Sequence, residues 1–211
     1  MILHAIGDSH CRLFWDLTDR GRVHWLGPML MHRVARDGLR GLRAAREWLG
    51  VRGETSDRDW VATIEPGATV AWCFGEIDVR CHLAERVAEG GGSILLSLTG
   101  EFLAVVEEFS SKTKTRPAIL SVTPATESRN AEYPCRGALS DRRAITALLN
   151  DALRVRCPDF GAVFADVFAE VSTPDGGIRR GLTQDGLHLG PAAAPIAQCA
   201  IEMAFGGLHV A

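Results

Sequence analysis

The sequence predicts a single α/β domain in which helices cover both faces of a parallel sheet. Short apolar runs alternate with longer segments whose apolar residues recur at helical spacing. The runs are continuously apolar, as expected of strands that are buried on both faces. The chain has 211 residues, of which 46% are hydrophobic and 23% charged, values typical of one soluble globular domain. We therefore expect residues 1–211 to form one three-layer α/β/α domain with about five strands.

Five apolar runs are the strand candidates, and most are bounded by Gly or Pro. They are Ile2–Ile6, Arg22–Leu26, Ala68–Phe74, Ala118–Val122 and Ala162–Val167. The segments between them predict helices over Leu30–Leu49, Ser93–Phe109, Ser140–Val155 and Gly190–Phe205. Gly38 is expected to break the first of these helices or divide it into two. Ser140 is the expected N-cap of the third, and Pro191 suits the first turn of the fourth.

Composition argues against several function classes. A net charge of -3 gives no electrostatic reason to expect a nucleic-acid partner. No apolar run reaches the roughly 18 residues of a spanning helix, and the N-terminus lacks the charge and length of a secretion signal. The six cysteines are scattered without a CxxC pair, so we expect reduced thiols, a cytoplasmic protein and no membrane partner.

Cofactor and metal signatures are also missing from the sequence. Neither GxGxxG nor GxxxxGK[ST] occurs, so no phosphate-binding loop is expected. The neighbouring pairs His10–Cys11 and Cys81–His82 do not have the spacing of known metal ligands, and we expect no metal and no cofactor. Nothing in the sequence predicts the oligomeric state.

The first chemical motif is Gly7-Asp8-Ser9-His10, directly after the first strand. A serine there lies at the carboxyl edge of the sheet, where open α/β sheets place their ligands. It also lies near a helix N-terminus, whose free N–H groups can stabilise an oxyanion. The alternative is that Asp8 or Ser9 only caps the helix that follows.

The second motif is Asp185-Gly186-Leu187-His188, just before the last helix. A serine hydroxyl becomes a good nucleophile when a base removes its proton, and neutral imidazole suits that task near pH 7. An aspartate three residues before the histidine can hold the other ring nitrogen and fix the tautomer. A plain surface turn ahead of a helix would explain the same residues.

Together the two motifs resemble the first and last blocks of the SGNH (GDSL-type) hydrolase superfamily, and the resemblance spans the whole chain. It implies a flavodoxin-like domain with strand order 2-1-3-4-5 and hydrolysis of carboxylic esters, often acyl or acetyl groups on lipids and sugars. By position, Ser9 would be the nucleophile and an oxyanion donor through its N–H. His188 would be the base, and Asp185 its orienting partner.

The two middle blocks match the family less well. The family's G-x-N-D block corresponds to Gly75-Glu76-Ile77-Asp78, so Ile77 stands where an oxyanion-binding Asn is expected. Losing one such donor typically costs about 10²–10³ in rate. The sequence Gly-Glu-Ile-Asp-x-Arg is similar to a variant of this block in GDS-type proteins of bacterial polysaccharide loci. The remaining oxyanion or substrate-binding candidates are Gly27, after the second strand, and Glu76, Asp78, Arg80 and His82.

These observations leave three functions open. The first is an esterase that acts on a small-molecule or glycan ester, for example a sugar deacetylase. The second is an O-acyltransferase that uses the same triad. The third is a non-catalytic carbohydrate-binding module, a hypothesis motivated by Ile77. Five tryptophans are candidates for a sugar-stacking platform, although the one at position 72 lies in a predicted strand and should be core.

Overall fold

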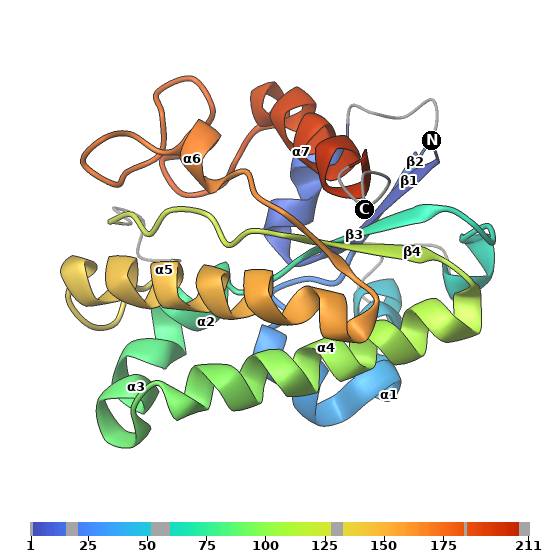
Figure 1. The fold of residues 1–211 in the computed structure, drawn as a ribbon, viewed down its shortest axis with the longest axis horizontal. Helices are drawn as coiled ribbons and strands as arrows, with labels where there is room; N and C mark the ends of the chain where they lie inside the picture. The colour runs from blue at the N-terminus through green and yellow to red at the C-terminus, as the bar shows by residue number, and fades with distance from the viewer. Residues whose placement is uncertain (1, 16–20, 52–59, 128–132, 184, 207–211) are drawn as a thin grey trace.

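The computed structural model describes residues 2–15, 21–51, 60–127, 133–183 and 185–206. A five-stranded, all-parallel sheet with the order β2-β1-β3-β4-β5 forms its centre (Figure 1). The strands are β1 (Leu3–Gly7), β2 (Gly21–Trp25), β3 (Thr69–Cys73), β4 (Arg116–Leu120) and β5 (Val163–Ala165). The predicted strands, their order and the three-layer fold class are confirmed, with every strand end shifted by one or two residues.

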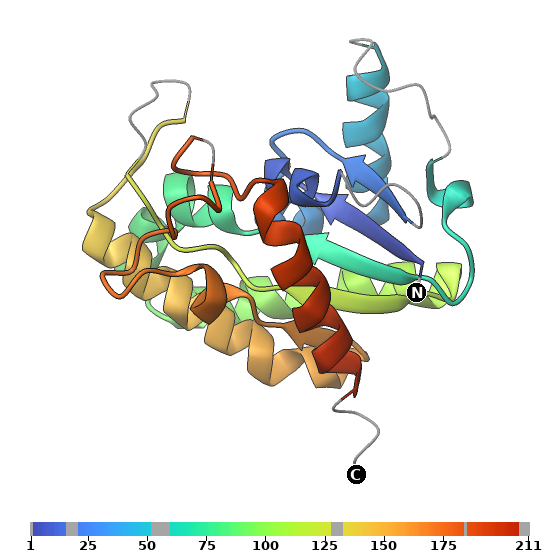
Figure 2. The same ribbon diagram turned by 90° about the horizontal axis from the view of Figure 1, so that it is seen from above.

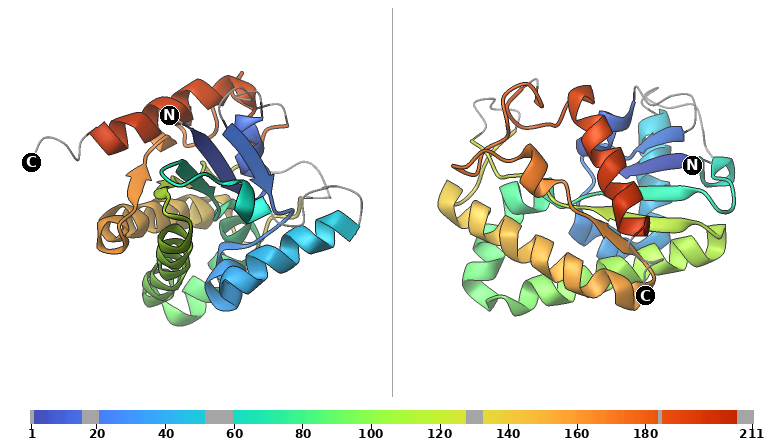
Figure 3. Two further views of the ribbon diagram at one scale, coloured as in Figure 1. Left: turned by 90° about the vertical axis from the view of Figure 1, so that its right-hand side faces the viewer. Right: turned by 45° about the horizontal axis from the view of Figure 1, so that its top comes forward.

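Helices lie on both faces of the sheet, as Figures 2 and 3 show from two further directions. One face carries α1 (Met31–Val51), α4 (Ser93–Thr113) and α5 (Leu139–Arg156), and the other carries α7 (Ala194–Gly206). The shorter helical elements are η1 (Ser9–Phe14), η2 (Trp60–Thr63), α2 (Glu76–Asp78), η3 (Val79–Leu83), α3 (Ala84–Gly90), η4 (Cys157–Phe160), α6 (Phe168–Val171) and η5 (Pro191–Ala193). In the described ranges, no helix has the length and apolar character needed to cross a membrane.

Each face of the sheet has its own apolar cluster. Trp60 and Trp72 are fully buried in the cluster beneath α1, α4 and α5. Trp72 packs edge to face against Phe102 and Phe109, an arrangement that aromatic pairs favour. Two of the five tryptophans are therefore core residues. The side chain of Trp48 lies outside the described part of the structure.

The structure confirms the predicted helix break at Gly38 and contradicts the predicted helix cap at Ser140. Gly38 has φ 59° and ψ -152°, values that interrupt α1 and that glycine adopts without the strain of a Cβ. The predicted break is confirmed. The Ser140 cap is wrong, because α5 begins at Leu139 with Ala138 as the N-cap, and Ser140 lies within the first turn.

Gly7 is the position where β1 and β3 approach too closely for any side chain. A Cβ on Gly7 would lie 2.2 Å from the carbonyl oxygen of Cys73, its partner on β3. Because that atom belongs to a central strand, the sheet itself must shift to make room. Gly7→Ala is expected to lower the free energy of unfolding by about 1–3 kcal/mol, measured by urea denaturation.

Gly92→Ala provides the matched control for this prediction. A Cβ on Gly92 meets nothing within 4 Å, and its φ of -65° is ordinary for alanine. Its effect on the free energy of unfolding should stay within about 0.5 kcal/mol. Equal effects of the two substitutions would contradict the packing argument.

Candidate active site

A cleft of about 460 Å³ opens at the carboxyl edge of the sheet, within the usual range for small-molecule sites. The N-terminal part of the chain contributes Ser9, Arg12, Trp15, Trp25, Gly27 and Pro28 to its lining. The C-terminal part contributes Tyr133, Asp185, His188, Leu189, Gly190 and Pro191. The fold thus brings the two sequence motifs, separated by more than 170 residues, to the same cleft.

Ser9 is the first residue of η1, a six-residue 3₁₀ helix that follows β1. Asp8 is its N-cap, and the Asp8 carboxylate accepts a hydrogen bond of 2.8 Å from the backbone N–H of His10. The capping role that the sequence left open therefore belongs to Asp8. Ser9 remains available to the cleft.

His188 lies in a tightly closed loop. Asp185 Oδ1 accepts the backbone N–H groups of Leu187 and His188 at 2.9 and 2.7 Å. Asp185 Oδ2 lies 2.6 Å from Nδ1 of His188. Leu187 and Leu189 are buried on either side of the histidine, so the loop is anchored while the imidazole faces the cleft.

The same contacts set the ionisation of Asp185. Partial burial alone would raise its pKa, but the hydrogen bonds from His188 and from the backbone of Leu187 lower the pKa to about 2. Asp185 is therefore a carboxylate throughout the neutral range. An ionised partner at Nδ1 leaves Nε2 of neutral His188 without a proton, as a general base requires.

Ser9 and His188 share the cleft without a direct bond. No hydrogen bond joins the two side chains in the part of the chain that the structure describes. Catalytic hydrogen bonds are often long in unliganded enzymes and tighten when the substrate binds. The geometry therefore places Ser9 and His188, the predicted nucleophile and base, at one cleft, and direct contact between them requires a local adjustment.

A second imidazole, that of His10, packs next to the ring of His188. Its ring centre is 5.0 Å from that of His188, and the side chain is buried. Its Nδ1 lies 3.2 Å from the Asp8 carboxylate and its Nε2 lies 3.4 Å from the carbonyl oxygen of Leu187. Burial acts to lower the pKa of His10, but the hydrogen bond and charge of Asp8 outweigh it and the pKa is raised. His10 thus connects the serine motif to the histidine loop.

The loop that follows β4 supports the histidine loop from the other side. The Thr126 hydroxyl donates to the carbonyl oxygen of Gly186 at 2.8 Å. The carbonyl of Thr126 accepts from the buried guanidinium of Arg142 on α5. Nearby, the buried Asn150 side chain pairs with both the N–H and the C=O of Val122 at 2.7 and 3.0 Å. These non-local contacts fix the loop without contributing to the cleft lining.

The structure places Glu76, Asp78, Arg80 and His82 outside the cleft lining. Asp78 is fully buried, and instead of facing a substrate it accepts hydrogen bonds from the backbone N–H groups of Met31 and His32 at the start of α1. Those N–H groups have no partner within the helix, which explains why a carboxylate is held there. His82 packs edge to face against the ring of His32. Gly27 is the one member of this predicted group that lines the cleft.

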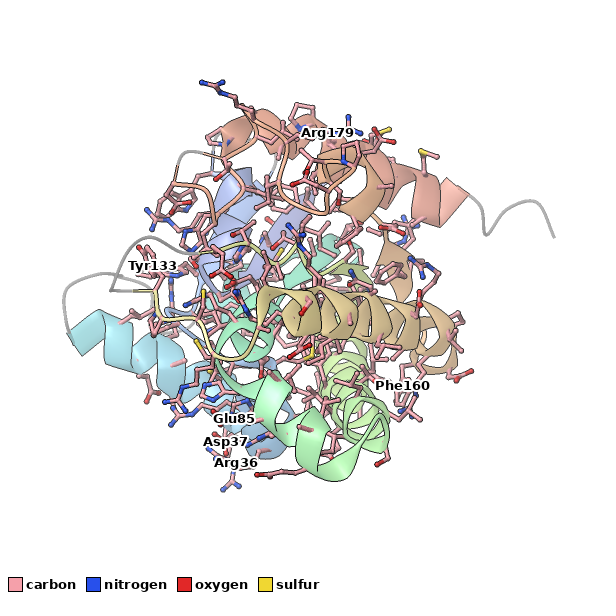
Figure 4. All side chains as sticks on the ribbon, turned by 90° about the vertical axis from the view of Figure 1, so that its left-hand side faces the viewer. Arg36, Asp37, Glu85, Tyr133, Phe160 and Arg179 are labelled. Carbon is pink, nitrogen blue, oxygen red and sulfur yellow. The ribbon has the colours of Figure 1, made fainter. Side chains whose placement is uncertain are left out.

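Tyr133 is a cleft residue that sequence reasoning missed (Figure 4). Its ring packs edge to face on His188, with ring centres 5.2 Å apart. The next residue, Pro134, is held by Arg80. The Arg80 guanidinium donates to the Glu76 carboxylate at 2.8 Å and to the carbonyl oxygen of Pro134 at 3.0 Å. The Glu76–Arg80 pair therefore holds the segment that carries Tyr133. The only available sequence signal was that Tyr133 is the single tyrosine of the chain.

The Glu76–Arg80 ion pair should be important for stability because both side chains are buried. Arg80→Met leaves a buried carboxylate without its cation, and we expect a loss of about 3–5 kcal/mol in the free energy of unfolding. The double variant Glu76→Leu/Arg80→Met removes both charges and should be more stable than the single variant. Urea denaturation of the wild type, the single variants Glu76→Leu and Arg80→Met, and the double variant measures the coupling energy. Strictly additive effects of the two substitutions would contradict this prediction.

The described residues show no metal-binding cluster, and sequence comparison identifies no relative. The described residues contain no group of three or more His, Cys, Asp or Glu side chains arranged to hold a metal ion. The sequence matches no protein-family model and no curated protein.

Several solved structures share this fold at low sequence identity. A GDSL-like lipase from Bacteroides thetaiotaomicron has a TM-score of 0.56 at 15% identity, covering 98% of this chain and 88% of that chain. An extracellular lipase from Streptomyces rimosus gives 0.55 at 14% identity, covering 94% and 98%. An acetylxylan esterase from Geobacillus stearothermophilus, solved as a catalytic mutant, gives 0.52 at 15% identity, covering 97% and 93%. The chain therefore has the fold of the SGNH (GDSL-type) hydrolases.

Proposed function

We propose that this protein is a serine hydrolase that cleaves a carboxylic ester through an acyl-Ser9 intermediate. The observation that supports it most is the cleft that Ser9 shares with a hydrogen-bonded Asp185–His188 pair. The ester would be an acyl or acetyl ester of a small molecule or glycan. Solved proteins with the same fold include lipases and an acetylxylan esterase.

In the proposed mechanism, Ser9 Oγ attacks the acyl carbonyl while Nε2 of His188 takes the hydroxyl proton. Asp185 stabilises the imidazolium that forms, without itself accepting the proton. Collapse of the tetrahedral intermediate expels the alcohol, which receives the proton from His188. Water then attacks the acyl-enzyme by the same route and releases the acid.

The oxyanion requires donors that face the cleft. The backbone N–H groups of Ser9 and Gly27 are the proposed donors, because both residues line the cleft. Ile77 supplies no side-chain donor and lies outside the cleft lining. We therefore expect turnover below that of an enzyme with a third donor, by about 10²–10³.

A fluorophosphonate probe tests the proposal, because it reacts with serines that an adjacent base activates. The expected result is one adduct, located on Ser9 by mass spectrometry, that is absent from His188→Ala. Folded protein without an adduct would contradict the hydrolase and favour a carbohydrate-binding module, the alternative motivated by Ile77. An adduct accompanied by a burst of alcohol and slow release of acid would instead favour an O-acyltransferase.

The proposal also covers the cellular compartment of the protein and its class of partner. We place it in the cytoplasm, supported by the six cysteines, all of which are free thiols. The partner in this proposal is a small-molecule or glycan ester, and a net charge of -3 gives no electrostatic reason to propose nucleic acid instead.

A further inference from the structure

The proposed nucleophile belongs to a row of three side chains on η1 and its C-cap residue, Trp15. In a 3₁₀ helix, residues three apart eclipse one another. Ser9, Arg12 and Trp15 follow this spacing, and all three line the cleft, whereas the residues between them are buried. Arg12 therefore lies one 3₁₀ turn from Ser9, roughly 6 Å along the helix axis.

Two tryptophans fix the guanidinium of Arg12 at the cleft wall. Its Cζ lies 4.2 Å from the ring centre of Trp15 and 5.5 Å from that of Trp25, within the range of cation–π attraction. A guanidinium that contacts aromatic rings through its face can still donate hydrogen bonds from its N–H edges. In the described part of the chain, the side chain of Arg12 makes no hydrogen bond and no ion pair, and only its backbone carbonyl accepts a hydrogen bond, from the N–H of Trp15.

Asp185 is the acidic residue in the described lining of the cleft, and both of its carboxylate oxygens already have hydrogen-bond partners. Asp185 accepts two backbone N–H groups and binds His188 Nδ1. Among the described residues, the Arg12 guanidinium thus has no ion-pair partner, and it lies close to the proposed nucleophile. A cation in this position can bind a negatively charged group of a substrate.

We propose that the substrate carries a carboxylate, which Arg12 binds through its N–H edge while the ester lies at Ser9. This inference rests on the proposed function and names its substrate class, an acidic ester such as an acylated acidic sugar. A carboxylate matches the planar fork of arginine in shape. Its single charge also suits a cleft that contains ionised Asp185, whereas a phosphate monoester carries about -1.5 to -2 charges.

Two matched ester pairs test the inference. In the first, 4-nitrophenyl hemisuccinate is compared with 4-nitrophenyl butyrate, so the carboxylate is on the acyl part. In the second, acetylated methyl glucuronoside is compared with acetylated methyl glucoside, so the carboxylate is on the alcohol part. We expect kcat/KM to favour the acidic ester in one pair by about 10- to 100-fold, and the pair that responds identifies the part that carries the acid.

Variants then assign the preference to Arg12. In Arg12→Gln the ratio should fall towards one, and in Arg12→Lys it should be intermediate, because lysine keeps the charge but loses the fork. Arg36→Gln is the matched control with an unchanged ratio, since Arg36 pairs with Asp37 on α1 and is drawn well apart from Tyr133 in Figure 4. A ratio near one in both wild-type pairs, or a ratio that Arg12→Gln leaves intact, overturns the inference.

A binding measurement tests the carboxylate site independently of ester hydrolysis, and so distinguishes this inference from the proposed function. Calorimetric titration with glucuronate and with glucose needs no turnover. Tighter binding of glucuronate that is lost in Arg12→Gln supports the carboxylate site even where no ester is cleaved and Ser9 is not labelled. Equal binding together with equal hydrolysis of acidic and neutral esters overturns the site while leaving the hydrolase proposal intact.

Discussion

Ser9→Ala is expected to lower kcat/KM for 4-nitrophenyl acetate by about 10⁴- to 10⁶-fold, the range seen when other triads lose their nucleophile. The substitution removes one oxygen from a half-buried side chain at the cleft. The Asp8 cap of η1 uses the backbone of His10 and is unaffected. Stability in urea should therefore stay within about 0.5 kcal/mol of wild type, so that the loss reflects chemistry.

The matched control for this prediction is Ser140→Ala. Ser140 is exposed in the first turn of α5, outside the cleft, and its removal should leave kcat/KM unchanged. Because all six cysteines are free thiols, the assay should be repeated after alkylation to exclude hydrolysis by a surface thiolate. Retention of more than a tenth of the activity by Ser9→Ala would show that another group performs the cleavage.

The parts of this molecule that were predictable from sequence depend on local patterns. A parallel strand buried on both faces has a continuous apolar run, and the predicted runs Ile2–Ile6 and Ala68–Phe74 correspond to the adjacent, paired strands β1 and β3. Parallel strands share one carboxyl edge, so a serine after β1 could be expected at the ligand edge of the sheet. The Asp185–His188 bond also follows from its three-residue spacing.

The residues that were missed are positioned by contacts between distant segments. Asp78 follows β3 and looks like a cleft residue, yet it caps α1, 47 residues earlier in the chain. Tyr133 reaches His188 because Arg80, more than 50 residues away, holds the carbonyl of Pro134. No local spacing encodes either contact.

Arg12 was missed for a different reason. The sequence indicated that a helix follows Ser9 but not whether its period is 3.0 or 3.6 residues. A period of 3.0 residues aligns Arg12 and Trp15 with Ser9 in a single row, whereas a period of 3.6 residues would spread the three side chains over about 120° of the helix surface.

The second large effect is expected at Asp185. In Asp185→Asn, the side-chain oxygen must stay at the Oδ1 position, because the N–H groups of Leu187 and His188 donate to it. The new amide NH₂ then occupies the Oδ2 position and donates to Nδ1 of His188. That contact selects the tautomer with its proton on Nε2, which cannot accept the proton of Ser9. We expect kcat to fall about 10⁴-fold, as when a triad is forced into the wrong tautomer, with a small change in KM.

Two measurements distinguish this tautomer effect from a structural one. The ¹⁵N shifts of the His188 ring should show the proton on Nδ1 in wild type and on Nε2 in Asp185→Asn, while urea stability remains similar because the loop keeps its backbone bonds. Since the pKa of wild-type Asp185 is about 2, the carboxylate is fully ionised from pH 5 to 8, and its own titration adds no pH dependence to the loss in that range. Asp175→Asn, in a surface turn away from the cleft, should leave kcat unchanged. An Asp185→Asn protein with wild-type kcat would show that the loop carboxylate does not orient a catalytic imidazole.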